Sequence, residues 1–146
     1  MAQPRIGQKV VVDVPATTAN LGPGFDCLGA ALDLNNRFAM SRIEGSGERF
    51  ELIIEGTEGS HLRGGPENLV YRAAQRVWQA AGVEPVALEA RVRLAVPPAR
   101  GLGSSATAIV AGLMGANALV GEPLSKEKLL ELAIDIEGHP DNVVPS

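Results

Sequence analysis

The sequence has 146 residues, 45% hydrophobic and 21% charged, which is the composition of an ordinary globular protein with one domain or one domain and part of another. Its 13 basic and 17 acidic residues give a formal net charge of −4, which argues against broad nucleic-acid binding because that needs a basic face. The single cysteine, Cys27, excludes an internal disulfide. The sequence shows no signal peptide and no window near the roughly 18 apolar residues of a membrane span. We therefore expect a soluble cytoplasmic protein with no membrane partner.

Three segments in the first third of the chain have the composition of β-strands. They are residues 9–16, 36–44 and 49–56, rich in valine, isoleucine and phenylalanine. Pro15 is expected to stop the first strand. The stretch "TTANLGPGFDCLG" that follows has the asparagine, glycine and proline residues of an irregular loop.

The middle of the chain predicts a helix followed by a strand. The helix covers "ENLVYRAAQRVWQAAG" and ends at Gly82, and its apolar stripe consists of Leu69, Ala73, Val77 and Ala80. We expect Tyr71 and Trp78 to serve packing rather than ligand stacking. Residues 86–97 then alternate, with Leu88, Ala90, Val92 and Leu94 inward and Arg91 and Arg93 on the polar face.

Two further helices follow. The first runs from about Ser104 to Gly121, and Ser125 is the expected N-cap of the second, whose apolar stripe is Leu129, Leu132, Ala133 and Ile136. The order of elements predicts a mixed α+β layer structure. Because the sequence stops within "HPDNVVPS", which has the composition of a site, we expect it to be a fragment of a longer protein.

The segment "PPARGLGSSATA" joins the last strand to the first of these helices. Glycines at 101 and 103 let a ligand approach the backbone closely, and the first helical turn offers free N–H groups and a positive dipole to an anion. Ser104 and Ser105 add hydroxyls that suit phosphate or magnesium, and Arg100 adds a bidentate phosphate contact. The alternative is a plain strand-to-helix turn in which a serine caps the helix.

Two familiar phosphate loops fit this segment poorly. A Walker A loop needs a lysine after its last glycine, and the segment has none. Gly101, Gly103 and Ala106 satisfy the dinucleotide pattern, but the acidic residue expected about 20 positions on is missing, since Glu122 stands in a Gly-Pro turn. The loop is therefore of another type.

Two other segments are rich in polar groups. Asp26 suits an ammonium group and Asn20 a hydroxyl or carboxylate, although both residues are also common turn formers. Glu137, His139, Asp141 and Asn142 cluster after the last helix, at a spacing too short for a helical zinc motif. We read Cys27 as a small apolar residue without a nucleophilic role.

The glycine segment resembles the phosphate-binding signature of the GHMP kinases. The resemblance implies the N-terminal domain of that superfamily: a mixed β-sheet with helices on one face and a left-handed βαβ crossover. It implies ATP and Mg²⁺ as cofactors, with Ser105 and Glu137 as the magnesium ligands and Glu131 as a competitor of Glu137. It assigns ATP binding to one run of residues: Pro97, Pro98, Ala99, Arg100, Gly101, Leu102, Gly103, Ser104, Ser105, Ala106 and Thr107.

Two more motifs, "PATTANLGPGFDCLG" and "EGHPDN", resemble the branch of that superfamily that phosphorylates the side-chain hydroxyl of L-homoserine. The resemblance implies substrate contacts for Asn20, Asp26 and His139, and it matches Asp141 to an aspartate that acts as a base in some relatives. It also implies a missing C-terminal domain, little activity for this chain alone, and a possible homodimer. A mevalonate-type kinase and a non-catalytic nucleotide- or metabolite-binding module are the alternatives.

Overall fold

The computed structural model describes residues 3–19, 29–56, 64–95, 103–138 and 144–145, and it confirms the mixed α+β class. Four strands and three helices follow one another in the order predicted. They are β1 (Lys9–Ala19), β2 (Gly29–Arg42), β3 (Phe50–Glu55), α1 (Leu69–Ala81), β4 (Leu88–Arg93), α2 (Ser104–Leu119) and α3 (Lys126–Glu137). Within these ranges, no helix is long and apolar enough to cross a membrane.

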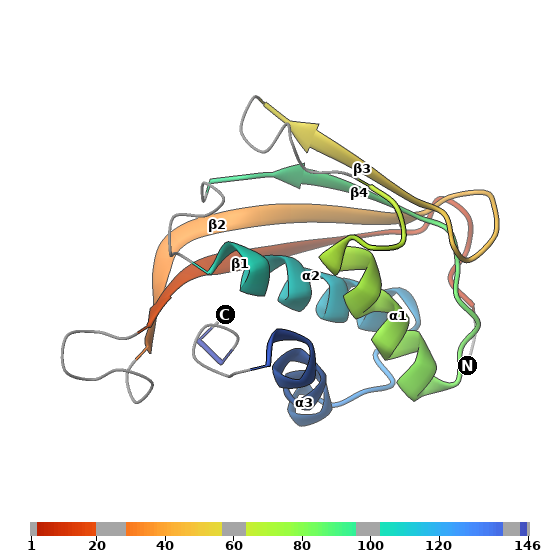
Figure 1. Cartoon of the computed structure of the whole chain (residues 1–146). Helices are drawn as coiled ribbons and strands as arrows, with labels where there is room; N and C mark the ends of the chain where they lie inside the picture. The colour runs from red at the N-terminus through yellow and green to blue at the C-terminus, as the bar shows by residue number, and fades with distance from the viewer. Residues whose placement is uncertain (1–2, 20–28, 57–63, 96–102, 139–143, 146) are drawn as a thin grey trace.

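The strands form one mixed sheet in the order β1-β2-β4-β3. β2 is antiparallel to both β1 and β4, whereas β3 and β4 are parallel. The three helices lie on one face of this sheet, as the resemblance implied (Figure 1). Helix α1 connects the parallel pair β3 and β4, which gives the expected βαβ crossover; its left-handedness stays a prediction.

The first two strands are longer than their sequences predict, and Pro15 does not stop β1. Pro15 lies opposite Asn35, and the register shifts between Pro15 and Thr17. A proline is tolerated there because β1 is an edge strand among the described strands and the ladder is already irregular at this point. β2 likewise begins at Gly29 and not near residue 36.

Helix α1 ends at Gly82 as predicted but begins at Leu69, two residues after the expected start. Its buried face keeps Ala73 and Val77 of the predicted stripe and is shifted around the helix from the rest. The Asn68 side chain accepts a hydrogen bond from the N–H of Val70 at 2.9 Å, and Gly82 ends the helix with φ of 67°. Tyr71 and Trp78 are fully buried, as expected for packing residues, whereas Ala80 is exposed. Burial of the two aromatic rings determines which face of α1 packs against the core, because these rings have the most apolar surface to remove from water.

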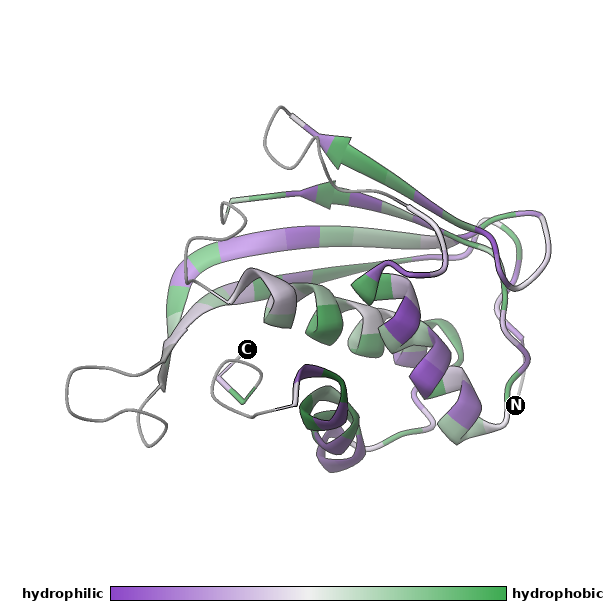
Figure 2. Ribbon diagram, in the orientation of Figure 1, coloured by the Kyte–Doolittle hydropathy of each residue, from purple (hydrophilic) through white to green (hydrophobic). Residues whose placement is uncertain are grey.

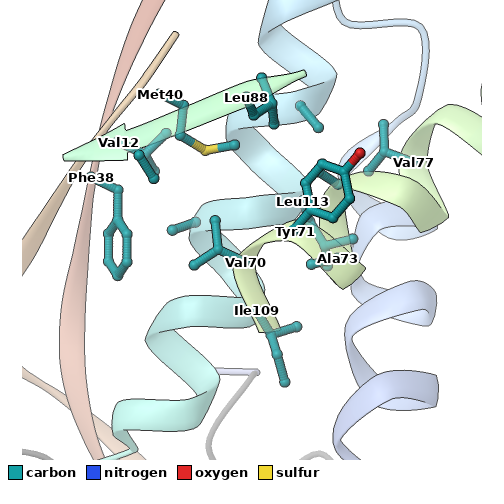
Figure 3. Packing of buried hydrophobic residues seen from close by; sticks show 14 of the residues in the cluster. Val12, Phe38, Met40, Val70, Tyr71, Ala73, Val77, Leu88, Ile109 and Leu113 are labelled. Atoms are coloured by element: carbon teal, nitrogen blue, oxygen red, sulfur yellow. The ribbon is translucent and has the colours of Figure 1, made fainter. Parts of the chain in front are cut away.

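Helix α2 is the central helix of the core. It lies between the sheet and α3, and Figure 2 shows hydrophilic residues along α1 and α3 but few on α2. A Cβ atom on Gly112 would overlap the Val70 carbonyl oxygen of α1, and one on Gly115 would overlap the Met40 sulfur of β2. These two glycines therefore let α2 approach its neighbours more closely than any other residue allows. Side chains from the sheet and from α1 and α2 fill the space around them (Figure 3).

Helix α3 is fixed to α2 at the turn that joins them. The Asn117 side chain donates to the Leu124 carbonyl oxygen and accepts from the Leu124 N–H, both at 3.0 Å. Ser125 caps α3 as predicted, accepting from the N–H of Lys128 at 3.2 Å. With this end held, the opposite end of α3 comes to lie beside the start of α2.

Candidate active site at the start of helix α2

The first turn of α2 has no side-chain cap within the described part of the chain. Its N-cap is Gly103, with φ of 70°, whereas Asn68 and Ser125 cap α1 and α3. The alternative in which a serine caps this helix is therefore wrong. The first-turn N–H groups have no partner within the helix, and the helix dipole adds a partial positive charge. This arrangement suits an anion.

Two predicted magnesium ligands, 32 positions apart in the sequence, meet at this turn. The Ser105 hydroxyl lies 3.1 Å from Oε1 and 3.5 Å from Oε2 of Glu137, and donates to that carboxylate. Ser105 belongs to the first turn of α2 and is exposed, and Glu137 is the last residue of α3 and is half-buried. Gly138 ends α3 with φ of 89°. A hydroxyl and a carboxylate thus adjoin the uncapped helix end.

Glu131, the competitor for the metal, has a different neighbour. Its carboxylate forms an ion pair of 2.9 Å with Lys128, and its side chain is 66% exposed. Six residues separate it from Glu137, which turns it by about 240° around the helix axis. The structure therefore brings Glu137, and not Glu131, to Ser105.

The donor set fits magnesium better than a softer metal. In the described ranges, no three His, Cys, Asp or Glu side chains gather in one place. One carboxylate and one hydroxyl match Mg²⁺, which prefers oxygen ligands and keeps most of its shell for water and substrate phosphates. Zinc, by contrast, takes nitrogen and sulfur ligands from the protein.

A buried amide, which the sequence reading missed, joins the site to the sheet. Asn36 of β2 donates from Nδ2 to the Thr107 hydroxyl at 3.0 Å, and its Oδ1 accepts from the N–H of Ala95 at 2.9 Å. The Thr107 hydroxyl in turn donates to the Ser104 carbonyl oxygen at 2.8 Å. The only signal in the sequence is a polar residue in phase with the apolar side chains of a strand.

The other predicted site residues divide into two sets. Gly103, Ser104, Ser105, Ala106 and Thr107 lie in or next to the first turn of α2. Others lie outside the described residues, and their roles stay predictions: Asn20, Asp26, Pro97, Pro98, Ala99, Arg100, Gly101, Leu102, His139 and Asp141.

Comparison with known proteins identifies the family of this chain. The family pattern described as the GHMP kinases N terminal domain matches residues 68–146, which include α1, β4, α2 and α3. The chain therefore belongs to the GHMP kinase family.

Particular relatives narrow the likeness. Homoserine kinase from Synechococcus sp. (strain CC9605) is 97% identical over all 146 residues, which cover 46% of that protein. The crystal structure of homoserine kinase from Cytophaga hutchinsonii matches 99% of this chain and 48% of its own, with a TM-score of 0.82 and 30% identity. Mevalonate kinase from Methanococcus jannaschii shares the fold, with a TM-score of 0.70 at 14% identity, over 90% of this chain and 46% of its own. The chain spans about half the length of the curated relatives it matches.

Proposed function

We propose that this chain is the ATP-binding part of a homoserine kinase, which transfers the γ-phosphoryl group of ATP to the side-chain hydroxyl of L-homoserine. The observation that carries the reaction class is the contact of Ser105 with Glu137 beside a helix N-terminus that no described side chain caps. The substrate rests on the likeness to homoserine kinase, 97% identical over the whole chain.

Phosphoryl transfer depends mostly on positioning and on neutralising charge. The N–H groups of the first turn of α2 would hold phosphate oxygens at the positive end of the helix. The Ser105 hydroxyl and the Glu137 carboxylate would hold Mg²⁺, which supplies positive charge to the phosphates. The hydrogen bond from Ser105 holds the two side chains together.

The amino acid would be bound by residues outside the described ranges. Asp26 would pair with its ammonium group, and Asn20 and His139 would orient it, while Asp141 would accept the proton of the attacking hydroxyl. Arg100 would add a contact to the phosphates. These assignments follow from the resemblance of the motifs that contain the residues.

The chain would form the N-terminal domain of a two-domain enzyme, because it spans 46% of the length of its homoserine kinase relative. The remaining length would supply a C-terminal domain with a group for the substrate carboxylate. We therefore propose that residues 1–146 alone have little activity, and that the whole protein is a cytoplasmic enzyme that forms the homodimer the resemblance implies.

The test is an assay of the full-length protein with Mg-ATP, following ADP release with L-homoserine, mevalonate and L-serine in parallel. Turnover with L-homoserine alone, abolished by Ser105→Ala and by Asp26→Ala, is the expected result. Turnover with mevalonate instead would keep the kinase and overturn the substrate. ATP binding without turnover of any alcohol would overturn the enzyme in favour of a binding module.

A further inference from the structure

We infer that Asn36 is a positioning residue that sets the first turn of α2 for nucleotide binding, an inference that rests on the proposed kinase function. The residue lies on β2, where every second side chain turns inward toward the helices. Phe38 and Met40 occupy the next two inward positions and are buried, and Asn36 is 1% exposed. A primary amide at a core position is costly unless its polar atoms have partners.

Two partners of Asn36 lie on either side of Gly101 and Gly103 in the sequence. Its Oδ1 accepts from the N–H of Ala95, just beyond the end of β4, and its Nδ2 donates to the hydroxyl of Thr107 in the first turn of α2. The amide therefore fixes Ala95, before the glycines, and Thr107, after them, relative to the same strand, β2.

Through its hydrogen bonds, Thr107 connects Asn36 to the N-terminal turn of α2. Its hydroxyl accepts from Asn36 and donates to the Ser104 carbonyl oxygen at 2.8 Å, so its single proton has a set direction. The Ser104 carbonyl shares a rigid peptide plane with the N–H of Ser105. Fixing that carbonyl therefore fixes the direction of a first-turn N–H and the position of the residue that contacts Glu137.

The position needs a side chain that donates and accepts at once. An aspartate at position 36 keeps the acceptor for Ala95 but loses the donor to Thr107 and adds a buried charge. An apolar side chain loses both hydrogen bonds. Since the described contacts of Asn36 reach Thr107 and Ala95, which flank the glycines, its loss should weaken nucleotide binding more than binding of the second substrate.

The experiment measures the Kd of Mg-ATP, the KM of L-homoserine and the thermal midpoint Tm in the full-length protein. The variants are Asn36→Asp, Thr107→Val, which removes the hydroxyl at constant shape, and Thr107→Ser, which keeps it. Val77→Ala is the matched stability control, because it truncates a buried side chain of α1 far along the sequence from the site. The Thr107 pair decides the question if Asn36→Asp does not fold.

We expect Asn36→Asp and Thr107→Val to raise the Kd of Mg-ATP about tenfold, the effect of losing one buried hydrogen bond. The KM of L-homoserine should change less than about twofold. Thr107→Ser, which keeps the hydroxyl, should recover most of the Mg-ATP affinity that Thr107→Val loses, and Val77→Ala should lower only Tm. A Kd that stays within about twofold of wild type in Thr107→Val, whatever happens to Tm, would overturn the positioning role.

Failure of the proposed function has a different signature. A wild-type protein that binds Mg-ATP but does not phosphorylate L-homoserine would overturn the substrate, while the Kd series would still test Asn36. A wild-type protein that does not bind Mg-ATP would overturn both inferences.

Discussion

Helix α2 has functionally different glycines in two regions: one leaves backbone N–H groups accessible, and the others allow close packing. At Gly103 the backbone has φ of 70°, and no side chain among the described residues caps the N–H groups of the first turn, which leaves them for a ligand. At Gly112 and Gly115 the absent side chain admits the backbone of α1 and the thioether of Met40, so the helix is closed against its neighbours. The first region serves ligand binding and the second serves packing. Substitutions in the first should therefore change activity or Mg-ATP binding, and substitutions in the second should change stability.

The largest expected effect lies at the open end. Glu137→Gln in the full-length protein should lower kcat/KM on the order of 100-fold, because the variant loses a negatively charged metal ligand beside the phosphates. Its Tm should change little, since a neutral amide still accepts a hydrogen bond from Ser105. Steady-state kinetics and a thermal melt measure the two quantities.

Glu131→Gln is the matched control on the same helix, because Glu131 pairs with Lys128 and is largely exposed. It should retain activity within about twofold and alter stability by no more than about 0.5 kcal/mol. Equal losses of activity in the two variants would contradict the assignment of Glu137.

At the packed region, Gly112→Ala should destabilise the fold by about 2–3 kcal/mol, since its Cβ meets a backbone oxygen that cannot turn aside. Gly115→Ala should cost about 1 kcal/mol, because the flexible Met40 side chain can move. Chemical denaturation of both variants measures the difference. The reverse order would show that the α2–β2 contact, and not the α1–α2 contact, is the tighter one.

Gly103→Ala should combine a loss of stability smaller than that of Gly112→Ala with a loss of Mg-ATP binding. The left-handed backbone at this position costs a residue with a Cβ roughly 1–2 kcal/mol. Strain at the N-cap would also displace the first-turn N–H groups that suit phosphate, so the Kd of Mg-ATP should rise. Gly112→Ala, compared at a temperature where both variants are folded, should leave that Kd unchanged. If both glycine variants shift the Kd equally, the two regions are not separable.

The smallest effect is expected on the sheet face away from the helices. Asp13 and Arg37 form an ion pair there at 2.8 Å, and the Arg37 hydrogen bond and charge hold the pKa of Asp13 below its ordinary value. A lowered pKa stabilises the fold above the unfolded-state value, and this contribution is lost as the pH falls through the folded-state value. Asp13→Asn should therefore lower Tm at pH 7 and leave it unchanged at low pH. The decrease at pH 7 should be small, because both side chains of the ion pair are exposed.

Local signals in the sequence predicted much of the fold. Gly82, Ser125 and the alternation around Arg91 and Arg93 each act within one turn or one strand, and the structure confirms them. Pro15 misled because its effect depends on whether the strand is at an edge, which is a property of the sheet and not of the segment.

The site divides in the same way. Ser105 and Glu137 were expected to share a metal from the resemblance of their motifs, and the structure brings them together. Asn36 could not be found by local reasoning, because its described partners lie 59 and 71 positions away in the sequence. Gly112 and Gly115 carry no local signal either, since only the neighbours across the interface show why a side chain is excluded.

The pairing of α2 and α3 has a consequence for how such chains can change in length. The two helices are tied together at Asn117 and Leu124 and meet again at Ser105 and Glu137, so their lengths between these points must correspond. One inserted residue in either helix would shift its end by about 1.5 Å and rotate it by about 100°, which would carry the carboxylate away from the hydroxyl. Insertions and deletions in homologues should therefore fall in the connecting segments. Helices α2 and α3 should keep their lengths even in homologues whose other side chains differ widely.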